Sequence, residues 1–134
     1  MFILLSCFEQ GDCSDYSSNE ALVQFYNFSD KKARSIVIDS ITTVGWDSVV
    51  NRSLSSIRLP FHSTATVMTY HFYYEKKHAV LVLSFKTETF PLAPGCDAID
   101  LITLLEAAPT VIQDAKISQP KLTSNVVENI KLYF

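Results

Sequence analysis

The sequence predicts an α+β fold, with an antiparallel β-sheet built from hairpins in the N-terminal two-thirds and C-terminal helices packed on one face of the sheet. Three observations lead to this prediction. The segment Val67 to Lys86 is rich in aromatic and β-branched residues on both sides of a charged turn, which is typical of a long β-hairpin. Turn residues also separate the apolar runs that precede it. The last third spaces its apolar residues as helices do, behind Asp97 and Asn125.

Length and composition bound what the chain can be. The 134 residues, 1–134, are expected to form a single domain, large enough to bury a core without the help of a metal or disulfides. Charged residues make up only 19% of the chain, below the roughly 25% of an average soluble domain. Few charged side chains are then left to cover the surface, so we expect a protein partner to cover part of it. A compact monomer with a Ser/Thr-rich surface is the alternative.

The N-terminal residues MFILLSCF are apolar, but they are too short to span a membrane and lack the basic flank of a signal peptide. Leu4 to Cys7 resembles a bacterial lipobox, yet no charged residue precedes it. We therefore expect a buried first strand here and no membrane span. A polar loop over Gly11 to Asn19 follows.

The next segments favour a first hairpin. A turn at Ser29 to Lys32 separates Ala21 to Phe28 from the β-branched run Ala33 to Val44. If Phe28 pairs with Ala33, one face carries Val23, Phe25, Ile36 and Ile38. A helix over Glu20 to Phe28, capped by Ser18 and Asn19, stays open.

Two further segments precede the main hairpin. Trp46 to Ser56 breaks the strand pattern, and Ile57 to Phe61 resumes it. Pro60 makes the second of these an edge strand, because proline cannot donate a hydrogen bond to a neighbouring strand.

The main hairpin separates into two different faces. A four-residue tip, Glu75 to His78, pairs Tyr74 with Ala79. One face is then wholly apolar and is predicted to be core: Met68, Tyr70, Phe72, Tyr74, Ala79, Leu81, Leu83 and Phe85. The other face is mixed and is where we expect a partner to bind: Thr69, His71, Tyr73, Val80 and Val82.

The C-terminal third is predicted to be helical. Two prolines and a glycine make Thr89 to Gly95 a rigid loop. Asp97 to Ala108 then forms a helix, and Pro109 ends it or restarts a short helix or strand over Thr110 to Ile117. Asn125 followed by Glu128 is similar to a capping box and predicts a final helix.

No pattern of catalytic or metal-binding residues is found. His62, His71 and His78 have no ligand spacing, so we expect packing or surface histidines, no metal and no cofactor. Cys96 precedes a predicted helix, where its thiol pKa would fall, but Asp97 and Asp100 oppose a thiolate. A structural or exposed cysteine is therefore expected, and the protein is predicted not to be an enzyme.

Charge and cysteines suggest partners and compartment. The net charge is −3 and the eleven basic residues are scattered, so we expect no nucleic-acid binding, which needs a concentrated basic surface. Cys7, Cys13 and Cys96 are odd in number and include no Cys-x-x-Cys pair. A disulfide framework is therefore not expected, and a reducing compartment, cytoplasmic or nuclear, is favoured.

Two short segments resemble known families. Phe90-Pro91-Leu92-Ala93-Pro94 looks like the Tyr-Pro-x-x-x-Pro turn of RWD domains, with Phe for Tyr and one residue fewer, which implies a non-catalytic interaction module. The C-terminal Leu132, Tyr133 and Phe134 are similar to the hydrophobic-Tyr-X tail with which proteasome activators and assembly chaperones dock. That resemblance implies docking through these residues and the terminal carboxylate. The alternative is that they pack on the sheet.

Together these observations predict a non-enzymatic subunit or adaptor of a larger protein assembly, in a complex with one or more other proteins. A proteasome assembly or regulatory factor is one alternative. A PH-like or RWD-like peptide-binding module is another.

Overall fold

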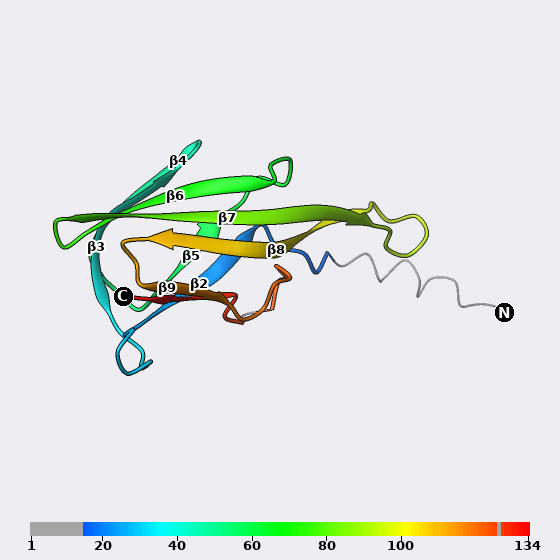
Figure 1. Cartoon of the computed structure of the whole chain (residues 1–134). Coiled ribbons are helices and arrows are strands. Elements are labelled where there is room, and N and C mark those ends of the chain that lie inside the picture. The colour runs from blue at the N-terminus through cyan, green and yellow to red at the C-terminus, as the bar shows by residue number, and fades with distance from the viewer. Residues whose placement is uncertain (1–14, 126) are drawn as a thin grey trace.

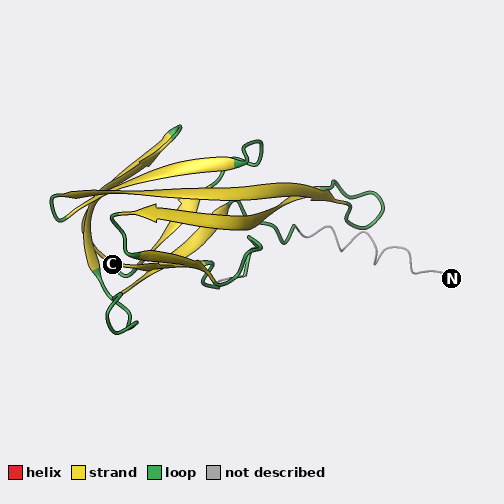
Figure 2. Cartoon of the chain, in the orientation of Figure 1, coloured by secondary structure: helices red, strands yellow, loops and turns green. Residues whose placement is uncertain are grey.

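The computed structural model describes residues 15–125 and 127–134, and these form a sandwich of two β-sheets (Figure 1). The predicted α+β fold is wrong: strands and loops make up the whole of the described chain, without a helix (Figure 2). It follows that none of these residues forms a helix that could span a membrane. The expected first strand lies outside the described residues.

The two sheets differ in size and in strand direction. The five-stranded sheet has the order β4-β3-β6-β7-β8, all antiparallel, and its strands are β3 (Ile36–Thr43), β4 (Trp46–Leu54), β6 (Val67–Tyr74), β7 (Lys77–Phe90) and β8 (Ile99–Thr110). The four-stranded sheet has the order β5-β2-β10-β9, and its strands are β2 (Glu20–Tyr26), β5 (Ser56–Pro60), β9 (Asp114–Ile117) and β10 (Ile130–Tyr133). Strand β10 runs parallel to β2 and antiparallel to β9.

The segment predicted as a helix over Asp97 to Ala108 is instead strand β8. It pairs antiparallel with β7 along most of its length. The long strand β7 has two rows of backbone hydrogen-bonding groups, and β6 covers only one of them, so the second row needs another strand. This tertiary demand outweighs the helix propensity of the Leu and Ala residues. The buried side chains of β8 are Ile99, Leu101, Ile102 and Leu104.

The predicted final helix is also wrong, because its described residues form a loop and the strand β10. The side chain of Asn129 stabilises this arrangement: its Oδ1 accepts a hydrogen bond from the Leu22 amide at 2.9 Å, and its Nδ2 donates to the Gln119 carbonyl at 2.9 Å. Asn129 is 4% exposed, so these bonds replace its bonds to water. Of the two alternatives for Thr110 to Ile117, the strand is confirmed for Asp114–Ile117, which is β9, while Thr110 still belongs to β8.

The first predicted hairpin has the right core residues but the wrong pairing. Most of Ala21 to Phe28 forms a strand, β2, yet β2 and β3 belong to different sheets. Tyr26 forms an isolated bridge with Ala33, which precedes β3. The pairing of Phe28 with Ala33 is therefore wrong. The predicted break over Trp46 to Ser56 is wrong as well, because it contains strand β4. The shared core residues are confirmed as buried: Val23, Phe25, Ile36 and Ile38.

The main hairpin is confirmed, with a shorter turn than predicted. Glu75 and Lys76 have φ angles of 47° and 60°, which is the backbone of a two-residue type I′ turn. Tyr74 consequently pairs with Lys77 rather than with Ala79. A shift by two residues leaves every side chain on its predicted face. The apolar face is confirmed as core, with no member more than 5% exposed: Met68, Tyr70, Phe72, Tyr74, Ala79, Leu81, Leu83 and Phe85.

The two long sides of the sandwich are closed differently. On one side the Leu104 amide donates to the Pro120 carbonyl at 2.7 Å and the Leu122 amide donates to the Ile102 carbonyl at 2.9 Å, which ties β8 to the segment after β9. On the other side β4 and β5 are the outermost strands of their sheets. Pro60 lies at the end of β5, so the predicted edge strand is confirmed.

Candidate partner-binding surfaces

The predicted partner-binding residues of the main hairpin lie together on the outside of the five-stranded sheet. We define the β6–β7 outer face as the part-exposed residues Val67, Thr69, His71, Tyr73, His78, Val80, Val82 and Ser84. The register pairs Thr69 with Val82 and His71 with Val80 as cross-strand neighbours. The side chains therefore form one continuous strip, on the side of the sheet away from the core.

Three stacked rings form one end of this strip. The rings of Tyr73 and His78 are 4.6 Å apart between centroids and tilted by 9°, and the rings of His71 and His78 are 5.1 Å apart. Nδ1 of His71 lies 2.9 Å from Nε2 of His78, so one imidazole donates a hydrogen bond to the other. The stack and this bond hold the three side chains in place. His78 was not among the predicted residues of this face, because a four-residue tip places it in the turn.

The C-terminal residues lie elsewhere, inside the four-stranded sheet. Leu132 is fully buried and Tyr133 is 8% exposed, both in β10 between β2 and β9. The ring of Phe134 packs edge-on against Phe25 and Tyr74, each at 5.3 Å between centroids. These three residues are part of the sheet and core, and the structure does not bring them to the β6–β7 outer face.

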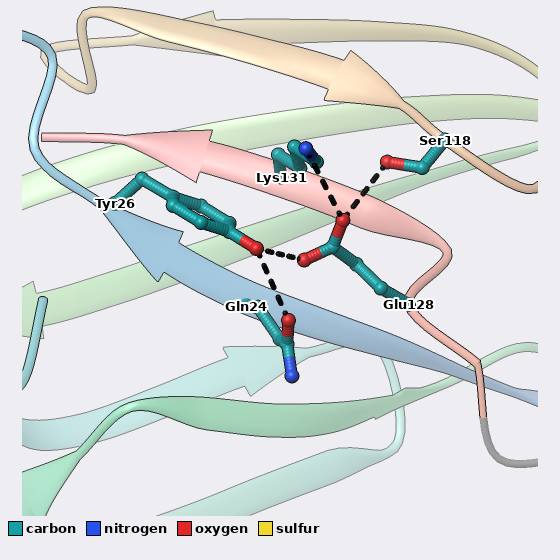
Figure 3. A network of polar contacts seen from close by, with 5 residues as sticks. All are labelled: Gln24, Tyr26, Ser118, Glu128 and Lys131. Carbon is teal, nitrogen blue, oxygen red and sulfur yellow. Dashed lines mark hydrogen bonds and ion pairs between the residues drawn. The ribbon is translucent and has the colours of Figure 1, made fainter. Parts of the chain in front are cut away.

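A network of polar side chains covers the outside of the four-stranded sheet (Figure 3). The Tyr26 hydroxyl donates a hydrogen bond to the Glu128 carboxylate, and Gln24 Oε1 lies 3.2 Å from the same hydroxyl. The Ser118 hydroxyl donates to Glu128 Oε1 at 3.1 Å, and Lys131 Nζ lies 3.7 Å from that oxygen. Glu128 thus joins β2, β10 and the end of β9.

The chemistry of this network indicates a structural role. The bond to Glu128, assisted by burial, raises the pKa of Tyr26 to about 12. At neutral pH the hydroxyl therefore stays protonated and acts as a hydrogen-bond donor. A tyrosine that acts as a general base at neutral pH must first lose its proton, which this raised pKa opposes. The bonds to Glu128 instead tie the strands together.

We predict that Tyr26→Phe lowers the free energy of unfolding by about 1–2 kcal/mol at neutral pH, because Glu128 loses a donated hydrogen bond. The folded pKa of about 12 lies above the ordinary value of 10, so the stabilisation by Tyr26 is complete below pH 10 and is lost as the pH rises towards 12. Denaturant unfolding of both proteins from pH 7 to 12 measures this. The difference between them should shrink above pH 10; a constant difference would contradict the role given to the hydroxyl.

Cys96 is disulfide-bonded, which makes it the structural cysteine of the two predicted alternatives. The loop that contains Cys96 follows the Phe90 to Pro94 segment, and the strand β8 comes next, in place of the helix predicted over Asp97 to Ala108. Within residues 15–125 and 127–134, no group of three or more His, Cys, Asp or Glu side chains gathers as a metal site.

Comparisons with protein-family models, with curated proteins and with solved structures found no match. No substrate, partner or active site can therefore be inferred from a relative. Functional proposals rest on the surfaces of the sandwich: the strip on the five-stranded sheet, the buried C-terminal strand and the side where β4 and β5 end the sheets.

Proposed function

We propose that the protein is a non-enzymatic subunit or adaptor that binds a protein partner through the β6–β7 outer face. The observation that carries this proposal is the composition of the face. None of its residues is an Asp, Glu, Lys or Arg, although neighbouring positions such as Lys86 and Glu106 are charged and exposed. An uncharged centre with aromatic residues, bordered by charges, is the composition of the core of a protein–protein interface.

The stacked rings favour this face as an anchor for a partner. Tyr73 is 38% exposed although it stacks on His78, so much of its surface is available for contact. Aromatic side chains that are already held in place lose little conformational entropy on binding, and they are enriched among the residues that dominate binding energy. Val80 and Val82 extend the apolar area beside the rings along β7.

The other functional alternatives receive less support. Docking through Leu132 to Phe134 requires a free tail, whereas these residues pair with β2 and β9 and pack in the core. The PH-like and RWD-like folds both need a helix, and the described chain has none. An interaction through the sheet face depends on neither feature.

The test is purification of the protein from its native cell and identification of what copurifies with it. The double variant Tyr73→Asp/Val80→Lys should lose the partner, because it buries two charges in the interface. Val44→Lys is the matched control: Val44 is 79% exposed in the β3–β4 turn, so this charge should leave the partner bound. Both variants should melt within a few degrees of the wild type. A partner retained by the folded double variant, or the absence of any partner, would overturn the proposal.

The compartment is a separate proposal, and the disulfide at Cys96 supports one that is oxidising. Disulfides persist in extracytoplasmic spaces and are rare in reducing ones, which speaks against the predicted cytoplasm or nucleus. Mass spectrometry after thiol alkylation in native cells tests this. Cys96 should resist alkylation until a reductant is added, whereas a freely alkylated Cys96 would restore the reducing compartment.

A further inference from the structure

A groove lies on the open side of the sandwich, away from the β6–β7 outer face. Its volume is about 860 Å³, and its walls come from β4, β5 and β2. Trp46 and Val50 of β4 and Ile57 of β5 form apolar parts of the wall, and each packs on the core with its inner side. The groove therefore has a built apolar surface, while the strands around it end their sheets.

Both strands that line the groove leave a backbone edge without a neighbouring strand. β4 pairs only with β3, and β5 pairs only with β2, among the strands of the described chain. The chain passes from one to the other at Ser55, so the two open edges belong to the same side of the sandwich. The opposite side is tied by the backbone bonds of β8 with residues 120–122.

The free backbone groups of β5 can be assigned. The Phe25 amide donates to the Ser55 carbonyl at 3.0 Å, and the Phe61 amide donates to the Asn19 carbonyl at 2.7 Å. In an antiparallel ladder every second residue is hydrogen-bonded to the neighbouring strand. Between Ser55 and Phe61 these residues are Ile57 and Leu59, so their backbone N–H and C=O groups point towards β2. The backbone N–H and C=O of Ser56 and Arg58 consequently point away from β2. Both residues line the groove.

The charge of the groove is opposite to that of the protein. Its charged lining residues are Arg52 and Arg58, both exposed, and no carboxylate is among the residues that line it. The chain as a whole carries a net charge of −3. Guanidinium groups bind carboxylates with two parallel hydrogen bonds, so this site favours an anionic occupant.

We propose that this groove binds an extended acidic segment of a partner protein, which adds to the edge of β5 as a further strand. The alternating donors and acceptors at Ser56 and Arg58 match the backbone of another strand, whereas an acyl chain or a small carboxylate offers no donors in that pattern. A second copy of this chain fits poorly, because a two-fold edge-to-edge contact brings the arginines of one copy towards those of the other. Carboxylates on the added strand pair with Arg52 and Arg58, and its apolar side chains contact Trp46 and Val50.

The site is independent of the β6–β7 outer face, so it can be tested without the partner proposed there. The probe is a fluorescent peptide of about eight residues, enough for one strand, in which Glu alternates with Val. Its matched control alternates Lys with Val. The Glu peptide should bind the wild-type protein and the Lys peptide should not. Binding should weaken as salt is added, because exposed ion pairs are screened.

A pair of double variants tests the arginines. Arg52→Gln/Arg58→Gln should lower the affinity for the Glu peptide by about tenfold or more, since it removes the two guanidinium groups that bind the peptide's carboxylates. Lys116→Gln/Lys121→Gln removes the same charge from exposed positions on the closed side and should leave the affinity unchanged. If both double variants lowered the affinity equally, peptide binding would depend on net charge alone, and the proposed site would be wrong.

Backbone pairing is tested on the unmodified protein, so no variant needs to fold. N-methylation of alternate peptide amides should abolish binding, and the amides of Ser56 and Arg58 should gain protection from hydrogen exchange when the unmethylated peptide binds. A methylated peptide that binds equally well, or protection confined to other strands, would contradict strand addition. If decanoate binds the groove and the Glu peptide does not, the arginines serve a lipid-like anion and the proposal fails.

Discussion

Deletion of Leu132 to Phe134 is expected to unfold the protein. Strand β10 is an inner strand of the four-stranded sheet, so its loss leaves β9 without a neighbouring strand in this sheet and β2 with β5 alone. Leu132 and Tyr133 are buried, and burial of each large apolar side chain stabilises a fold by about 1.5–3 kcal/mol. Together with the lost ring contacts of Phe134 and the lost strand pairing, this approaches the 5–15 kcal/mol that separates a folded domain from its unfolded chain.

Circular dichroism melting and proton–nitrogen NMR spectra of the deletion variant measure this effect. The cooperative melt and the dispersed amide resonances should both disappear at 25 °C. Lys131→Ala is the control, because Lys131 belongs to the same strand but its side chain is on the outer face, next to Tyr26. A deletion variant that keeps a dispersed spectrum would contradict the structural role. It would instead support docking through a free C-terminal tail.

The sequence could predict the main hairpin because its signals are local. Alternation along Val67 to Phe85 assigns every side chain to a face, and that assignment survives an error of two residues in the register. The turn itself was not recognisable. Type I′ turns usually contain Asn or Gly, and here Glu75 and Lys76 adopt the left-handed backbone instead.

The two strands mistaken for helices depend on distant parts of the chain. The apolar residues of Ile99 to Leu105 fit a helical stripe as well as a strand with a bulge, and the free edge of β7 decides between them. Ile130 to Tyr133 is a four-residue strand whose partner β2 lies more than a hundred residues earlier. No local pattern signals such a pairing.

The β6–β7 outer face could be predicted from local signals, whereas the groove could not. The five predicted residues of the β6–β7 outer face follow from alternation alone, as do Val67 and Ser84, while His78 joins them only through the observed register. The groove needs Arg52 and Arg58 on neighbouring edge strands of different sheets, and the strand that carries Arg52 was not predicted at all. The disulfide at Cys96 was missed because an odd number of cysteines excludes complete pairing but not a single bond.

Phe72→Ala is expected to lower the free energy of unfolding by about 3–5 kcal/mol, whereas Tyr73→Ala should lower it by about 1 kcal/mol or less. The two residues are neighbours in β6 and differ in the face they occupy. Phe72 is fully buried between the sheets, so its truncation leaves a cavity in the core. Tyr73 is 38% exposed and loses mainly its stacking contact with His78.

Urea unfolding of both variants at neutral pH measures the two free energies, and copurification from native cells measures what each does to partner binding. Tyr73→Ala should lose the partner and keep the fold, while Phe72→Ala should lose stability first and binding only as a consequence. The contrast separates the two faces of one hairpin, because the substitutions are adjacent in the chain and both remove an aromatic ring. Similar losses of stability in the two variants would mean that the outer face is covered in the folded protein. Binding through Tyr73 and Val80 would then no longer be tenable.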